Sequence, residues 1–168
     1  IVIIELLSST LKALSSFHNV AKPLILLSLI LFFFMEGKQL TTKTRRTMLV
    51  ALTFSLIGDI LLMFDNVSSN YFLTGLASFL IAHFMYIMVF LEKRNNLLKP
   101  IPFIALLLVY ALGFLYLLFD GLGYMFLPVV IYVLAILTMA ITASLRKGNV
   151  PTISYNLVLV GAILFVIS

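Results

Sequence analysis

Long apolar blocks alternate with short polar stretches along the whole chain. Blocks of about twenty apolar residues are typical of helices that cross a membrane, because a helix of that length spans the hydrocarbon core. We therefore expect an all-α fold, a polytopic transmembrane helical bundle. Glu5 and Lys12 interrupt the first block. The pattern predicts seven membrane segments, at residues 1–17, 20–35, 47–64, 71–91, 100–119, 124–144 and 151–168.

The basic residues alternate between the predicted loops. The loops after segments two to six carry four, zero, three, zero and two Lys or Arg residues. Cytoplasmic loops of membrane proteins are enriched in basic residues, so this alternation supports the segment count and predicts the orientation. We expect loops 36–46, 92–99 and 146–150 to face the cytoplasm, and Asp65 and Asp120 to face the opposite side. Compact loops without appended domains favour a bacterial inner (cell) membrane.

Composition agrees with a membrane protein. The chain is 63% hydrophobic and 10% charged, and its mean hydropathy is +1.22. A net charge of +5 in a soluble protein would suggest a nucleic-acid partner, but here the basic residues lie between apolar blocks and set topology. We therefore expect membrane lipids as partners and no nucleic acid. The sequence does not fix an oligomeric state.

One transmembrane domain is expected over residues 1–168. The apolar run 161–168 continues to the last residue, without a polar end to close it. We therefore expect the sequence to be cut inside a membrane segment at its C-terminus. Its start at Ile1, not Met, allows a cut at the N-terminus as well.

Two predicted segments each carry one ionisable group, Asp59 and His83. A carboxylate at mid-membrane is unfavourable by roughly 2.5–3.5 kcal/mol even on insertion scales, so such residues are candidates for function. The rise of a helix places Asp59 about 8 Å and His83 about 18 Å from the non-cytoplasmic ends of their segments. With Lys22 near the outer end of its own segment, these depths predict a cavity that opens to the outer leaflet.

Each candidate also has a structural interpretation. Lys22, beside Pro23 in the expected first turn of its helix, could simply extend to the lipid headgroups. His83 could be a core histidine, and it borders a face that could be an interhelical contact. That face carries Tyr71, Thr74, Gly75, Ser78, Ala82 and Tyr86.

Asp59 has the strongest case for function among these residues. Gly58 beside it allows close backbone approach, and Ser55 lies one turn away on the same face. Tyr86 lies near His83, and Tyr132 lies well inside its predicted segment, whereas most other tyrosines lie near segment ends. We therefore take Asp59 and His83 as candidate catalytic residues, and Lys22, Tyr86 and Tyr132 as candidate substrate-binding residues.

Several chemistries lack their residues. The sequence has no cysteine and two histidines, whereas a zinc hydrolase uses about three protein ligands, usually His-rich. We therefore expect no metal site and no cofactor. No GxSxG elbow, phosphate-binding glycine loop or HExxH motif occurs. Ser/His/Asp catalysis stays open, although no serine has a distinguishing context.

An ordered set of short motifs resembles the YhhN family of integral membrane proteins, whose characterised members are lysoplasmalogenases. The family pattern places an aspartate directly after the serine that is Ser168 here, and its eight-helix layout implies one further segment. The resemblance spans nearly the whole chain. The matching motifs are AKPL (21–24), SLIGDILLM (55–63), FLTGLASFLIAHFMYI (72–87), LPVVIY (127–132) and GAILFVIS (161–168).

The resemblance implies a membrane-embedded hydrolase that cleaves the vinyl ether bond of a lysophospholipid, a lysoplasmalogen. Its products would be a fatty aldehyde and a glycerophospho-ethanolamine or -choline. Cleavage needs a general acid and a carboxylate that stabilises an oxocarbenium ion. Asp59 would supply the acid, alone or with the aspartate expected after Ser168, and His83 would orient a carboxyl group or relay the proton. Lys22 would hold the phosphate.

A transporter is the main alternative. Buried Asp and His residues also build proton relays, so the same pattern suits a small-molecule or lipid transporter or a proton-coupled carrier. An inverted repeat would favour a transporter, but the two halves of the sequence show no convincing similarity. A receptor or structural scaffold is a third interpretation.

Overall fold

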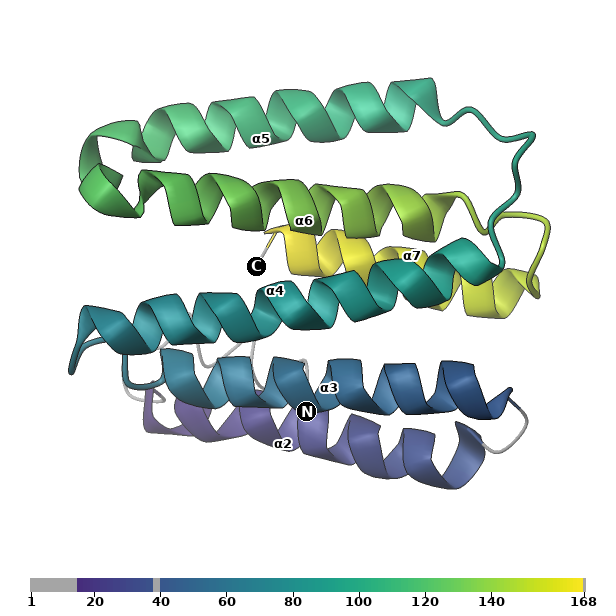
Figure 1. Cartoon of the computed structure of the whole chain (residues 1–168), viewed down its shortest axis with the longest axis horizontal. Coiled ribbons are helices and arrows are strands. Elements are labelled where there is room, and N and C mark those ends of the chain that lie inside the picture. The colour runs from purple at the N-terminus through teal and green to yellow at the C-terminus, as the bar shows by residue number, and fades with distance from the viewer. Residues whose placement is uncertain (1–14, 38–39, 168) are drawn as a thin grey trace. The chain divides into compact units, whose positions relative to one another are not determined.

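The described part of the chain is helical throughout. The computed structural model describes residues 15–37 and 40–167, and no strand occurs among them. Six α-helices and one 3-10 helix form in the described residues (Figure 1). They are α2 (Ser15–Glu36), α3 (Thr42–Leu62), α4 (Ser69–Glu92), α5 (Ile101–Leu122), η3 (Gly123–Met125), α6 (Phe126–Ser144) and α7 (Thr152–Ile167).

Two stretches of the described chain are long and apolar enough to cross a membrane. They are Ser69–Glu92, which is α4, and Ile101–Ser144, which contains α5, η3 and α6. The apolar helices Pro23–Met35 and Thr152–Ile167 are shorter. The described structure therefore does not support the seven membrane segments that the sequence predicts. The segment predicted at residues 1–17 lies outside the described residues except at its end, where α2 begins.

Helix α3 begins earlier than predicted because Thr41 caps it. The Thr41 hydroxyl oxygen accepts a hydrogen bond from the Thr44 backbone N–H at 3.3 Å, which satisfies a donor of the first turn. The prediction that 36–46 is loop throughout is therefore wrong for its last residues. Arg45 is helical, donates from Nη2 to the Phe34 carbonyl at 2.8 Å and lies 5.2 Å from the Phe34 ring centre.

Pro23 lies inside α2, so its predicted place in the first turn is wrong. The helix already begins at Ser15, and a proline inside a helix leaves one backbone carbonyl without its usual N–H partner. Lys22 precedes it in the same helix, and its side chain lies outside the described residues. The substrate-binding role of Lys22 therefore stays a prediction.

The chain forms two compact units, which divide within α4 between Ala82 and His83. The first unit contains α2, α3 and the beginning of α4. The second contains the rest of α4 and all later helices. Each unit is described by itself below.

Small residues bring α3 close to the beginning of α4 in the first unit. The Ser78 hydroxyl donates to the Phe54 carbonyl at 2.7 Å. A Cβ atom added at Gly58 would lie 2.6 Å from Phe79 Cδ2, and one added at Gly75 would lie 3.4 Å from the Gly58 carbonyl oxygen. Small residues permit such close helix packing in lipid. This part of the predicted α4 face is therefore an interhelical contact face.

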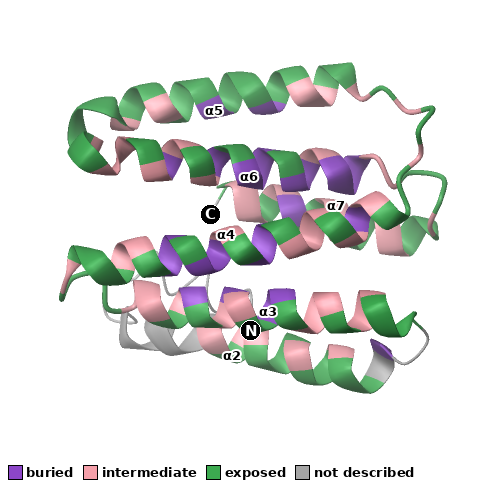
Figure 2. Cartoon of the chain, viewed as in Figure 1, coloured by how far each residue is buried: buried purple, intermediate pink, exposed green. Residues whose placement is uncertain are grey.

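Helix α6 supplies most of the core of the second unit. It packs against α5 on one side and α7 on another, and buried positions cover much of its length (Figure 2). Val129, Val133, Ile136 and Ala140 recur at three- and four-residue intervals and are all buried. Helix α5, in contrast, is mostly exposed, as expected of a helix that contacts lipid.

Asparagine side chains join the loop after α4 to the loop after α6. Asn95 donates from its backbone N–H to the Leu145 carbonyl at 2.7 Å and from Nδ2 to the Lys147 carbonyl at 3.1 Å. Asn149 donates from Nδ2 to the Arg94 carbonyl at 2.8 Å. We call these three bonds the asparagine clasp. They fix two loops that are far apart in the sequence.

Gly58→Ala should destabilise the protein by about 1–3 kcal/mol, because the new methyl group overlaps the buried Phe79 ring. Gly113→Ala is the matched control, since a Cβ atom there has nothing within 4 Å. Unfolding in detergent would be measured for both variants of the full-length protein. Equal stability of the two variants would contradict the close packing described here.

Asn95→Ala should lower the free energy of unfolding by about 1–3 kcal/mol, because it removes two side-chain hydrogen bonds. One is the clasp bond to Lys147, and in the other Asn95 Oδ1 accepts from the Leu97 N–H at 3.0 Å. The neighbouring Asn96 is exposed, so Asn96→Ala should have little effect. A similar loss in both variants would show that the clasp contributes nothing specific.

Candidate functional site

His83 is the most deeply enclosed ionisable side chain of the second unit among the described residues. It is 1% exposed and lies in the middle part of α4. Its ring meets the Tyr132 ring of α6 edge-on, at a centroid distance of 5.4 Å and an interplanar angle of 90°. It meets the Phe165 ring of α7 at 5.0 Å and 74°. Three helices therefore build the surroundings of this imidazole.

Helical periodicity explains why these rings meet. Tyr132 lies beside Val133 and three residues after Val129, on the buried side of α6. Phe165 lies three residues after Ala162, the buried residue of α7. The small Ala162 side chain lets α7 pack closely in lipid, so the ring one turn later reaches the interior.

His83 and Tyr132 can transfer protons, and the aromatic contacts hold the imidazole ring in one orientation. Imidazole can donate and accept hydrogen bonds through its two ring nitrogens, and it is the side chain that most readily changes protonation near neutral pH. The Tyr132 hydroxyl can also donate and accept. Edge-on aromatic contacts favour one orientation of the imidazole ring. The arrangement therefore suits a group that positions another group or passes on a proton.

Tyr86 contacts an aromatic residue of its own helix. Its ring is stacked on the Phe90 ring of the same helix, at a centroid distance of 6.2 Å and an interplanar angle of 16°. Tyr86 is half-buried and lies about one turn beyond His83 along α4. Its role in binding substrate stays a prediction.

Asp59 belongs to the first unit and lies near the end of α3. Only about 5 Å of helix separates it from the last helical residue, Leu62. It is half-buried, and the closely packed Gly58 and, one turn earlier, the buried Ser55 precede it along the helix. Because the C-terminus of a helix carries partial negative charge, a carboxylate there does not stabilise the helix. Local helix stability therefore does not explain Asp59.

The structure brings together some of the residues that the sequence singled out. His83 and Tyr132 are in contact within the second unit, whereas Asp59 lies in the first unit. A shared site for Asp59 and His83 is thus an element of the functional proposal. Phe165 was missed, because a phenylalanine in an apolar segment looks the same whether it faces lipid or a buried histidine. Within the described residues, no three His, Asp or Glu side chains group as metal ligands.

Comparison with known proteins gives one match. The sequence model of the YhhN family matches residues 17–168. No curated protein and no solved structure matches the chain. The family match and the two apolar spans together indicate a membrane protein.

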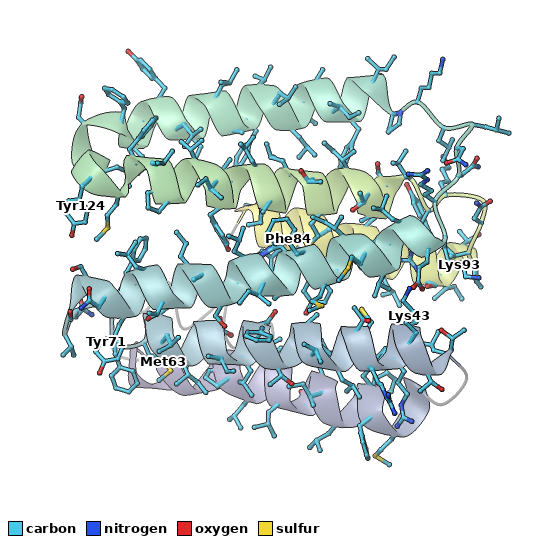
Figure 3. The ribbon with its side chains drawn as sticks, viewed as in Figure 1. Lys43, Met63, Tyr71, Phe84, Lys93 and Tyr124 are labelled. Atoms are coloured by element: carbon cyan, nitrogen blue, oxygen red, sulfur yellow. The ribbon has the colours of Figure 1, made fainter. Side chains whose placement is uncertain are left out.

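His83→Ala should destabilise the protein by about 2–4 kcal/mol, because it leaves a cavity against Tyr132 and Phe165. The adjacent Phe84, labelled on α4 in Figure 3, is 56% exposed, so Phe84→Ala removes a larger ring from a less enclosed place. It should lower stability much less. Thermal unfolding of both variants in detergent would decide, and a larger loss in Phe84→Ala would be inconsistent with an enclosed His83.

Proposed function

Because the chain belongs to the YhhN family, we propose that it is a membrane-embedded lysoplasmalogenase-like hydrolase. The substrate would be a lysoplasmalogen, a lysophospholipid with one vinyl ether chain. The observation that carries the proposal is the enclosure of His83 by Tyr132 and Phe165, in a chain that matches the family model and has a carboxyl group at Asp59.

The reaction adds one water across the vinyl ether and then breaks a carbon–oxygen bond. A general acid protonates the double-bond carbon that is not bonded to oxygen, and the double-bond electrons form the new C–H bond. The resulting oxocarbenium ion takes up water to give a hemiacetal, which collapses to a fatty aldehyde and a glycerophospho-ethanolamine or -choline. Protonation of carbon is the difficult step, so a positioned acid and a carboxylate that stabilises the cation should accelerate it most.

The proposed roles follow the chemistry of each side chain. Asp59 protonates the double-bond carbon that is not bonded to oxygen, alone or together with the aspartate that the family pattern places after Ser168. His83 orients a carboxyl group or relays the proton, which its fixed ring orientation supports. Tyr86 and Tyr132 bind the substrate, and Lys22 holds its phosphate. No metal or cofactor takes part in this scheme.

The proposed topology keeps the membrane segments and the orientation that the sequence predicts. All seven apolar segments would lie in the membrane as one domain, with an eighth in the full-length protein. The basic loops 36–46, 92–99 and 146–150 would face the cytoplasm of a bacterial cell, across the inner membrane. The positive-inside rule supports this orientation.

A proton-coupled carrier is the second candidate. The same buried His83 favours it, because histidines and carboxylates within membranes also form proton pathways. The two proposals differ in their product, since a carrier releases no aldehyde. Substrate-driven pH changes in proteoliposomes, without aldehyde release, would favour the carrier.

Asp59→Asn in the full-length protein should abolish turnover, at least about a hundredfold, because an amide cannot donate the proton that cleavage needs. Aldehyde release from a lysoplasmalogen in detergent would be measured with a coupled dehydrogenase. Asp120→Asn is the matched control, since Asp120 is an exposed carboxylate and its loss should leave turnover unchanged. Retained turnover in Asp59→Asn, with intact membrane insertion, would remove Asp59 from the mechanism.

A further inference from the structure

Arg146 lies two residues after the end of α6 at Ser144, beside the asparagine clasp. The clasp holds the loop after α4 against the loop after α6, and the carbonyls of Arg94, Leu145 and Lys147 accept its hydrogen bonds. These carbonyls are therefore already engaged, and the loops that surround Arg146 are fixed before any ligand arrives. A preformed frame lowers the entropic cost of binding.

The Arg146 side chain has unsatisfied hydrogen-bonding capacity. Its guanidinium carbon lies 5.2 Å from the centre of the Phe90 ring. Its Nε and Nη1 atoms are covered by protein and have no hydrogen-bond partner among the described residues. The side chain as a whole is half-buried, so part of it reaches the surface. Burial lowers the pKa of Arg146 below its ordinary value by desolvating the charged form.

Arg45, in the first unit, is an arginine whose contacts serve to hold two helices together. Arg45 has the same stacking distance, 5.2 Å from the centre of the Phe34 ring. It also donates from Nη2 to the Phe34 carbonyl at 2.8 Å, which ties its charge to α2. Arg146 makes the ring contact but no such hydrogen bond within the described residues. Stacking orients its guanidinium, and Nη2 is not among its covered donors.

The surrounding charges favour an anion. The loop after α4 carries Lys93, Arg94 and Lys99, and Lys147 follows Arg146; the only acid in these loops and at the end of α4 is Glu92. Lys93, labelled at the end of α4 in Figure 3, is exposed. The apolar span that contains α6 ends at Ser144, which places Arg146 at the depth of lipid phosphates if that span crosses the membrane.

We propose that Arg146, stacked on Phe90 and framed by the asparagine clasp, binds a phosphate group. A guanidinium held in a fixed plane binds a phosphate through charge-assisted hydrogen bonds, whereas a lysine ammonium acts as a mobile point charge. The phosphate belongs to the headgroup of an anionic phospholipid or to a free phosphate ion. The Phe90 ring also stacks on Tyr86, a proposed substrate-binding residue, but phosphate binding at Arg146 does not depend on the hydrolase proposal.

Native mass spectrometry of the full-length protein would test this site. Phosphatidylglycerol would be added to the protein in micelles of an uncharged detergent. Arg146→Gln should weaken phosphatidylglycerol binding about tenfold or more, because it removes a charge-assisted contact. Arg146→Lys keeps the charge and should still weaken binding severalfold. Lys147→Gln removes one charge from the same loop and should change binding about twofold or less.

A parallel titration with inorganic phosphate would distinguish the two sources of the ligand. Competition by millimolar phosphate would identify a site for the free ion, and binding of phosphatidylglycerol alone would identify a lipid site. Both results support the proposal if Arg146→Gln weakens the binding about tenfold or more. Wild-type binding of both probes by Arg146→Gln would overturn it. If that variant fails to fold, wild-type binding by Arg146→Lys would overturn it instead.

Discussion

Polar groups inside an apolar helical protein must find partners, and this constraint governs the structure. Backbone groups find them within each helix, and several hydroxyl groups find them on backbone carbonyls. The Thr138 hydroxyl donates to Leu134 one turn earlier, and the Ser78 hydroxyl donates across to Phe54. Ionisable side chains are the most unfavourable to bury in such a setting. His83, Asp59 and Arg146 are therefore the most informative residues of the described part of the chain.

Helix positions were largely predictable from the sequence, because runs of apolar residues bounded by polar loops determine them. The ends of helices were less predictable, since single side chains decide them. Thr41 starts α3 within the predicted basic loop, and Pro23 lies inside α2 although prolines favour first turns. The number of membrane spans was not supported, because among the described residues only Ser69–Glu92 and Ile101–Ser144 are long and apolar enough to cross a membrane.

The candidate site was predictable only in part. An ionisable residue in an apolar segment is conspicuous, so His83 and Asp59 could be found without a structure. Phe165 could not, because its contact with His83 depends on how α7 packs. Arg146 was interpreted as a topology signal alone, and its stacking on Phe90 becomes visible only when the two loops are placed side by side by the asparagine clasp.

We propose that the protein protonates carbon 2 of the alkenyl chain, the vinyl ether carbon that is not bonded to oxygen. The most direct test incubates the full-length protein with a lysoplasmalogen in deuterated water and analyses the products by mass spectrometry. The account predicts a fatty aldehyde that carries one deuterium on carbon 2, with no aldehyde from the matched ester lysophospholipid. Absence of aldehyde from a well-folded sample, or aldehyde without deuterium at carbon 2, would contradict it.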